Sequence, residues 1–510
     1  MNIPLFFRTI RHLKLKQVVY QLKNRIFPSK YVYYASPTCN KLVMTSMPVS
    51  RPISLKGNQF SFLNLTQDFT DWNDVSLGTL YTYNLNYFDF INDGNISLKE
   101  ASNWIEKFID DIPHITWGMD PYPIAVRGIN WIKFITKYFD QIDSSKLQLW
   151  NDSLYSQYKL LERKLEWHLL GNHLLEDIYS LYIASIYFND VKMFRKYSHL
   201  LSKELNEQIL PDGSHYEQSP MYHCILLDRL LDCINISADR SSESEFLNRY
   251  AIMMLGHLSE ICYRNGDIPL LNDAAYDIAP RPCQLFDYAR RLGLQWESIP
   301  MKECGYRKFN SDNMEAIVDV GNITASYQPG HSHADTFNYE MRINGKPYII
   351  DTGISTYEKN TRRQYERSTA AHNTVSVAGR DSSEVWGGFR VGRRAFVKIH
   401  EEDSCHIVAS HNGFPGANCM RSFQMSEGCF VVTDQVGTGV KAKSYIHFAP
   451  EVDVISLDRG RIRTSLAEID IQNADDIEIV DEFASVSYNA LRPIKKAVIS
   501  FTENLKYSIL

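Results

Sequence analysis

Apolar residues recur every three to four positions from about residue 98 to residue 295. This spacing predicts helices, because it places apolar side chains on one face of a 3.6-residue turn. The predicted helices cover residues 98–112, 124–139, 146–170, 174–188, 191–209 and 222–236. Short connections with turn signals, such as PDGS at 211–214, separate them. Sequential helices with short loops indicate antiparallel hairpins, which can stack as a solenoid or close into a toroid.

The pattern changes to short, often alternating strands from about residue 312. The predicted strands cover residues 316–320, 322–328, 336–343, 346–351, 373–379, 394–400, 429–436, 444–450, 467–472 and 477–483. Ten such strands separated by turns are typical of an antiparallel sandwich. Helices followed by strands predict an α+β multidomain chain. We divide it into a basic N-terminal segment (1–70), a helical domain (71–305) and a β-sandwich domain (306–510).

Composition indicates a globular chain, and charge is unevenly distributed along it. The 510 residues are 44% hydrophobic and 22% charged. The first 67 residues contain ten Lys or Arg and no Asp or Glu, so with a net charge of −6 the remainder carries −16. A basic helix packed on an acidic body is the simpler interpretation, and contact with a membrane surface or an anionic partner is the alternative. We expect no nucleic-acid partner.

Cysteine usage and the N-terminal sequence indicate the compartment. Nine cysteines form no CxxC pair, which favours a reducing environment over a disulfide framework. The sequence contains no run of about 18 apolar residues, so no transmembrane helix is predicted. The first residues lack the basic, long apolar and small-residue stretches that follow one another in a secretory signal. We therefore expect a cytoplasmic protein, with the periplasm as the alternative.

The first candidate site is GNHLLED at 171–177, where one predicted helix follows another. Asn172 and His173 lie at the junction, and Glu176 and Asp177 are expected in the first turn, where the helix dipole favours acids. The structural alternative is that Asn172 only caps the helix.

The second candidate site is PDGSHYEQSPMYH at 211–223, around a turn and a helix start. Its titratable groups are His215, Tyr216, Glu217, Tyr222 and His223. Pro220 is expected in the first helical turn with Ser219 as its cap. A capped helix start would explain part of this composition, but the density of titratable groups favours a site.

The third candidate site combines His331 and His333 with Asp351 and His372, all near predicted strands. Two histidines and one aspartate on adjacent β elements are a reasonable ligand set for a transition metal. A polar cluster that holds a sandwich loop explains the same residues, and spacing alone does not separate the two interpretations.

Cationic residues occur between Asp351 and His372. Arg362, Arg363 and Arg367 could bind carboxylates or sulfates, because a guanidinium matches planar anions. A neighbouring cation would lower the pKa of Tyr365 from about 10. A solvated charged loop is the structural alternative.

Several motifs together resemble the heparinase II/III family of bacterial polysaccharide lyases and related alginate lyases. The matching stretches are YNLNYFDF (83–90), PYPIAVRGINWIKF (121–134), NHLLE (172–176), DGSHYEQSPMYH (212–223), GHSHADTFNYEM (330–341), DTGISTY (351–357), HNTVSV (372–377) and SSEVWGGFRVGRRA (382–395). The resemblance spans most of the chain beyond residue 80. It implies an incomplete (α/α) toroid followed by an antiparallel β-sandwich.

The resemblance also implies cleavage of uronic-acid glycans by β-elimination. This reaction needs a neutralised carboxylate, a base and an acid at the sugar. By the resemblance, Asn172 neutralises the carboxylate with help from His173, and Tyr222 and His331 transfer protons. Tyr365 is a looser match to a second catalytic tyrosine. Arg127, Glu176, Arg363 and Arg367 are the expected substrate-binding residues.

The family's metal site matches His333, Asp351 and His372. The resemblance implies a structural zinc that braces the β loops, with calcium as the alternative. The expected partner is an anionic polysaccharide.

The chain departs from exported degradative relatives, because it shows no export signal. The N-terminal part resembles proteins encoded among surface-polysaccharide biosynthesis genes. A role at the inner face of the inner membrane, with peripheral contact through the basic N terminus, would suit such a protein.

Two other functions use the same features. A glycoside hydrolase on this scaffold would need paired carboxylates, for which Glu176, Asp177 and Glu217 are candidates. A non-catalytic glycan-binding or assembly protein would need no proton-transfer group, so the set Asn172, Tyr222 and His331 argues against it.

Overall fold

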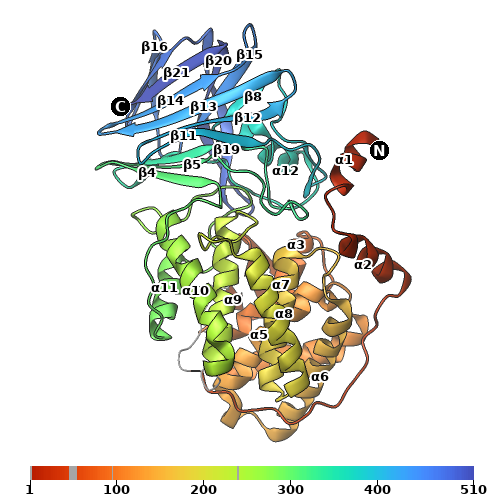
Figure 1. Cartoon of the computed structure of the whole chain (residues 1–510). Helices are drawn as coiled ribbons and strands as arrows, with labels where there is room; N and C mark the ends of the chain where they lie inside the picture. The colour runs from red at the N-terminus through yellow and green to blue at the C-terminus, as the bar shows by residue number, and fades with distance from the viewer. Residues whose placement is uncertain (1–2, 45–53, 95, 238–240) are drawn as a thin grey trace.

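A computed structural model describes residues 3–44, 54–94, 96–237 and 241–510, with the side chains of 241–243 outside the description. The predicted order of helices and then strands is confirmed (Figure 1). The helices are α1 (Ile3–Ile10), α2 (Leu15–Ile26), α3 (Thr79–Tyr87), α4 (Leu98–Asp111), α5 (Pro121–Tyr138), α6 (Ser144–Lys164), α7 (Gly171–Tyr187), α8 (Val191–Gln208), α9 (Pro220–Ile236), α10 (Ser241–Ile261), α11 (Pro282–Arg291) and α12 (Thr361–Glu366).

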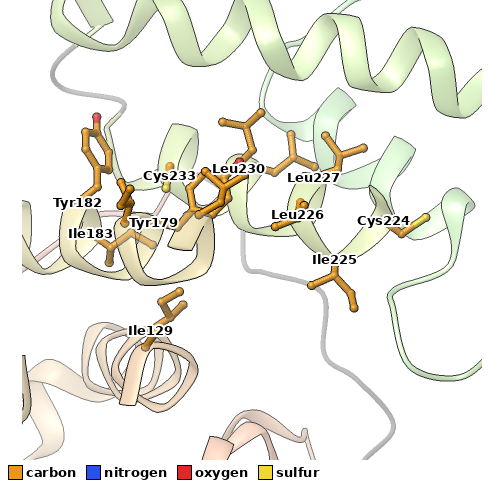
Figure 2. Close-up of a cluster of buried hydrophobic side chains, with 14 of the residues drawn as sticks. Ile129, Tyr179, Tyr182, Ile183, Cys224, Ile225, Leu226, Leu227, Leu230 and Cys233 are labelled. Atoms are coloured by element: carbon orange, nitrogen blue, oxygen red, sulfur yellow. The ribbon is translucent and has the colours of Figure 1, made fainter. Parts of the chain in front are cut away.

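Helix α7 lies at the centre of the helical domain and packs against α5, α8 and α9. It is buried along its whole length except at His173, as expected for a helix that is apolar on nearly every face. Figure 2 shows Tyr179 and Ile183 of α7 beside Leu230 of α9 and Ile129 of α5. Each fully buried aliphatic side chain of this kind contributes about 1.5–3 kcal/mol.

The strands of the β-sandwich domain follow α11. They are β4 (Tyr306–Asn310), β5 (Met314–Asp319), β6 (Tyr339–Ile343), β7 (Lys346–Ile349), β8 (Val375–Val377), β9 (Val385–Trp386), β10 (Arg390–Val391), β11 (Val397–Glu402), β12 (His406–Phe414), β13 (Ala417–Ser426), β14 (Cys429–Gln435), β15 (Lys441–His447), β16 (Val454–Asp458), β17 (Arg461–Thr464), β18 (Glu468–Gln472), β19 (Asp476–Ser487), β20 (Ala490–Thr502) and β21 (Asn504–Ile509).

All pairings between these strands are antiparallel among the described residues. The largest sheet has the order β11-β12-β13-β14-β21-β18-β17-β16, and two four-stranded sheets have the orders β19-β20-β15-β8 and β4-β5-β6-β7. Their inward side chains, such as Phe423, Phe430 and Ile499, form a second core separate from the helical one. The chain therefore has two hydrophobic cores, and the fold class predicted from the sequence is confirmed.

The N-terminal segment contains more than basic helices. A small antiparallel sheet, β1 (Ser54–Lys56), β2 (Gln59–Phe62) and β3 (Leu65–Asp68), follows α1 and α2. Phe60 is buried against Phe90 and Trp104, with ring centroids 5.0 Å away in both cases, so this sheet belongs to the helical core. The predicted boundary at residue 70 stays a prediction, as does the one at 305, which falls between α11 and β4.

Two predicted elements are wrong. The helix predicted over 146–170 ends at Lys164, and residues 165–170 form a loop in which the backbone N–H of Glu166 donates to Asp177. The strand predicted over 322–328 is absent, and His331 and His333 lie on the loop that follows. In both segments apolar residues, such as Leu165, Leu170 and Tyr327, pack against the helical core without forming a regular element.

Candidate active site

A cavity of about 1590 Å³ lies where the helical domain meets the β-sandwich domain. Its wall includes Asn172 and Tyr222 from α7 and α9, and His331 and Tyr357 from loops of the sandwich domain. The N-terminal segment adds residues from α1, α2 and the turn between them. Segments far apart in the sequence therefore form one site, large enough for several sugar units.

Tyr222 and His331 are stacked, with ring centroids 3.9 Å apart. Helix α9 positions Tyr222 in its first turn: Pro220 begins the helix, and the Ser219 hydroxyl accepts from the Tyr222 backbone N–H, as predicted. The Tyr222 hydroxyl lies 3.2 Å from that of Tyr357. Burial raises the pKa of Tyr222 above its ordinary value, so the phenol keeps its proton at neutral pH.

Three polar side chains surround the His331 ring. Its Nδ1 lies 2.9 Å from Asp273 Oδ2, and its Nε2 lies 3.2 Å from Asn172 Nδ2 and 3.4 Å from Glu217 Oε2. Because the Asp273 carboxylate only accepts, Nδ1 carries the proton and Nε2 presents its lone pair to the cavity side. Asp273 thus fixes the tautomer, as a carboxylate does beside a catalytic histidine.

Asn172 is held by Glu217. The Glu217 carboxylate accepts from the Asn172 backbone N–H at 2.8 Å and from Nδ2 at 2.7 Å. Gly171, at φ +60°, makes this possible, because a Cβ there would lie 2.1 Å from Glu217 Oε1. Asn172 is therefore no N-cap, and Glu176 and Asp177 fall beyond the first turn of α7, contrary to prediction.

His173 directly follows Asn172 on α7 and also lines the cavity. Its Nδ1 lies 3.1 Å from Glu166 Oε2. Burial opposes the charged imidazole, but the carboxylate of Glu166 outweighs this and raises the pKa of His173. His173 can therefore hold a positive charge beside an anionic ligand.

Asp273 accepts hydrogen bonds from three side chains of the site, and the sequence did not indicate its role. Besides His331, it accepts from His333 Nε2 at 2.8 Å and from both terminal nitrogens of Arg363 at 2.5 and 2.7 Å. Burial raises the pKa of this carboxyl, but Arg363 and the two histidines lower it well below its usual range. No motif surrounds Asp273 in the sequence, whereas Tyr357 and Glu217 lie within quoted motifs.

Two family models match the chain: the heparinase II/III N-terminus over residues 128–281 and the heparinase II/III-like C-terminal domain over residues 294–508. The chain belongs to the heparinase II/III family. The chain is similar to the heparin-sulfate lyase of Bacteroides stercoris, to which it is 21% identical over 54% of this chain and 45% of that protein. The heparin-sulfate lyase of Pedobacter heparinus is 22% identical over 66% of this chain and 56% of that protein.

This heparinase II/III family chain thus spans about half the length of the curated relatives it matches. Solved structures show the same fold. A crystal structure of heparinase III aligns with a TM-score of 0.66 at 15% identity, covering 86% of this chain and 79% of that one. A mutant heparan sulfate lyase from Pedobacter heparinus aligns with a TM-score of 0.60 at 15% identity over 97% and 87%.

The substrate-binding residues expected in this heparinase II/III family chain are buried away from the cavity. Arg127 donates to Gln157 and to the Asn86 carbonyl. Glu176 is paired with Arg229. Both side chains are fully buried and bonded within the protein, and their role in substrate binding stays a prediction.

Two further arginines and one tyrosine of the predicted site lie outside the cavity lining. Arg363 donates to Asp273 and to the Gly388 carbonyl, and Arg367 donates to the Ser332 carbonyl. Both have no exposed surface, and their role in substrate binding stays a prediction. Tyr365 points away from the cavity toward Glu482 and Lys496. Burial and the carboxylate of Glu482 raise the pKa of Tyr365, whereas the sequence predicted that a neighbouring cation would lower it.

The predicted metal ligands are neighbours but do not converge on one point. His372 Nδ1 lies 2.7 Å from Asp351 Oδ2, which also accepts from Asn338. His333 Nδ1 and His372 Nε2 have no partner. The residues described contain one three-ligand group within 4.8 Å, and it is a different one: Asp212, His257 and Cys304.

Asp351 is paired with His372, and two buried imidazole nitrogens, His333 Nδ1 and His372 Nε2, are left without a protein partner. These two nitrogens are the atoms of the predicted set that could bind an ion. Imidazole pairs suit zinc better than calcium, which prefers oxygen. Structural zinc stays a prediction, and elemental analysis of the purified protein tests it.

Proposed function

We propose that this protein is a polysaccharide lyase that cleaves a uronic-acid-containing glycan by β-elimination. The observation that carries the proposal is the convergence of Tyr222, His331 and Asn172 on one cavity wall. The named heparin-sulfate lyases support an anionic polysaccharide as the substrate class.

We assign the two proton transfers to two residues. His331 Nε2, with its lone pair free of Asp273, accepts the C5 proton as the C4–C5 double bond forms. The C4–O bond breaks, and Tyr222, still protonated, donates to the departing oxygen. One proton is gained and one is lost, so transfer between the stacked rings, or exchange with water, restores both groups.

Asn172 and His173 supply the electrostatic part. An Nδ2 hydrogen of Asn172 is aimed at His331 across 3.2 Å, a long contact that a uronate carboxylate can replace. His173 adds positive charge beside it. Together they stabilise the carboxylate as negative charge develops on it, which makes the C5 proton easier to remove.

The two alternative functions have less support. A hydrolase needs two free carboxylates across the sugar, but Glu176 is paired with Arg229, and Asp177 and Glu217 accept backbone hydrogen bonds. A binding module needs no stacked tyrosine–histidine pair beside a buried aspartate.

The test compares two tyrosine variants on a panel of uronic-acid polymers. Tyr222→Phe should lower the formation of the ultraviolet-absorbing unsaturated product by about 10²-fold or more. Tyr365→Phe, outside the cavity, should retain wild-type activity. Undiminished activity of Tyr222→Phe would remove Tyr222 from the mechanism, and new reducing ends without absorbance would indicate hydrolysis.

We also propose that the N-terminal segment rests on an anionic membrane surface, which would suit a role in surface-polysaccharide biosynthesis at the inner face of the inner membrane. No described helix has the length and hydropathy of a transmembrane span. Helix α2, however, turns an apolar stripe to solvent: Leu15, Val18, Val19, Leu22 and Ile26 are all exposed. Basic residues flank this stripe, as in helices that lie in a lipid interface.

A further inference from the structure

Arg394 is a buried cation without an acceptor in the described part of the chain. Its side chain is 6% exposed, its Nε has no hydrogen-bond partner, and it lines the cavity. Other buried arginines differ: Arg363 is paired with Asp273 and Arg421 with Asp434. An unpaired buried guanidinium is costly, so Arg394 calls for an anion from outside the protein.

Arg11 and His12, in the turn between α1 and α2, interact electrostatically with Arg394. Arg11 Nε donates to His12 Nε2 at 3.2 Å, and His12 lines the same cavity as Arg394. Burial and the charges of Arg394 and Arg11 lower the pKa of His12, so this imidazole is neutral at pH 7 and acts as a hydrogen-bonding group. Burial and then Arg11 lower the pKa of Arg394 to about 10, which still leaves the guanidinium charged at neutral pH.

Helix α1 is fixed to the loop that carries Arg394. Arg8 donates to both carboxylate oxygens of Glu384 at 2.8 Å, and Trp386 Nε1 donates to Thr9 Oγ1 at 3.1 Å. Glu384 is thereby occupied and cannot neutralise Arg394. These contacts hold α1 against the loop of Arg394, so that His12 and Arg394 line the same cavity and Arg11 is hydrogen-bonded to His12.

We propose that Arg394, with Arg11 and His12, forms a subsite that binds an anionic substituent, carboxylate or sulfate, of the glycan in the cavity. The inference rests on the proposed lyase function for the identity of the ligand. Both anions present oxygens that match the donor fork of a guanidinium. The subsite would hold a sugar unit away from the one that reacts at Tyr222, because none of its three residues contacts Tyr222, His331 or Asn172.

Direct binding tests the subsite without turnover. Isothermal titration of the full chain with sodium sulfate and, separately, sodium glucuronate should show binding of at least one probe, with sodium chloride as the ionic-strength control. Arg394→Gln and Arg11→Gln should each weaken it about tenfold. Tyr222→Phe and Arg195→Gln, an exposed arginine on α8, should not. The stronger probe identifies the substituent.

Kinetics provide the second measurement. On a polymer that the wild type cuts, Arg394→Gln should raise KM about tenfold with kcat nearly constant, since the subsite binds substrate and transition state alike. Arg11→Gln covers the case that Arg394→Gln does not fold, because Arg11 is exposed.

The outcomes separate the two proposals. The protein could bind sulfate or glucuronate through Arg394 and yet cut no polymer. That result would support the anion site and overturn only the lyase function. Binding of both probes with wild-type affinity by Arg394→Gln and Arg11→Gln overturns the subsite, even if lyase activity is intact. Absence of binding to the wild type, or an adventitious site elsewhere, also overturns it.

Discussion

At the scale of the residue, Asp273 determines how the other groups of the site are charged and oriented. Its carboxylate neutralises the charge of Arg363 and accepts hydrogen bonds from His333 Nε2 and His331 Nδ1. All four side chains are buried, so the arrangement depends on complete pairing. Asp273 is a positioning residue, because it acts on the reaction through His331.

Asp273→Asn should therefore lower kcat by about 10²–10⁴-fold, since an amide no longer enforces the productive tautomer. The pH profile of kcat/KM should change as well, which a purely structural residue would not cause. Asp434→Asn is the matched control: it also removes a buried carboxylate from an arginine pair, with Arg421. If both variants lose activity equally once folded, the proposed role of Asp273 is wrong.

Asp212 should contribute pH-dependent stability. Its carboxylate accepts from the backbone N–H groups of Lys302 and Cys304 and from Ser214. Burial raises the pKa of Asp212, but these hydrogen bonds outweigh it and lower the pKa from 3.8 to about 2. A depressed pKa stabilises the fold above the unfolded value of 3.8, and this contribution is lost as the pH falls toward 2.

Asp212→Asn should accordingly destabilise the protein by about 2 kcal/mol at pH 7. The difference from wild type should shrink between pH 4 and pH 2, as the wild-type carboxyl is protonated. Urea unfolding of both proteins across this pH range measures the effect. A difference that stays constant with pH would show that the charge of Asp212 is not the cause.

Single residues also show what the sequence could and could not predict. Asn172, Tyr222 and His331 were found because motifs surround them. Asp273 lies in a loop between α10 and α11 with no motif, and its role arises only from folding. For Arg127 and Arg363, a sequence shows a charge but not that the fold buries it and supplies its hydrogen-bond acceptors. For Tyr365, the sequence shows the neighbouring arginines but not that its hydroxyl donates to Glu482.

At the scale of the element, α1 forms part of the cavity wall, where Arg8 and Thr9 contact Glu384 and Trp386 at β9. Helix α2 adds Gln17, which donates to the carbonyls of Leu169 and Tyr327. Periodicity predicted the long helices well because their buried faces are continuous. It failed over 165–170 and 322–328, where apolar residues pack against the helical core from loops and no regular pattern is required.

The docking of α1 should depend on the Arg8–Glu384 pair. Arg8→Ala and Glu384→Ala should each increase trypsin cleavage within the first 30 residues several-fold, because a released helix is a better substrate. Electrophoresis and mass spectrometry of timed digests measure the rate. Lys41→Ala, which removes an exposed pair with Asp140, is the control. Cleavage rates equal to the control would mean that other contacts hold α1.

At the scale of the whole molecule, the site belongs to neither domain alone. Asn172 and Tyr222 come from helices with one hydrophobic core, and His331 and Tyr357 come from the domain with the other. The relative position of the domains therefore sets the Tyr222–His331 stacking. The sequence predicted both domains, but the approach of these residues required the interface between them.

The charge asymmetry of the molecule should be visible in membrane binding. The protein should sediment with vesicles that contain an anionic phospholipid and less so with neutral vesicles, and added salt should weaken binding. Leu22→Glu in the exposed stripe of α2 should reduce it, whereas Leu149→Glu, an exposed leucine on α6, should not. Equal sedimentation with both vesicle types would contradict the proposal.

The N-terminal helices supply cavity lining and cations but none of the proposed proton-transferring groups, and they precede both regions that match the family models. On the two proposals, selectivity and chemistry would be carried by different stretches of chain. Chimeras that exchange these helices with those of another family member should then change which polymers are accepted while the elimination itself is preserved.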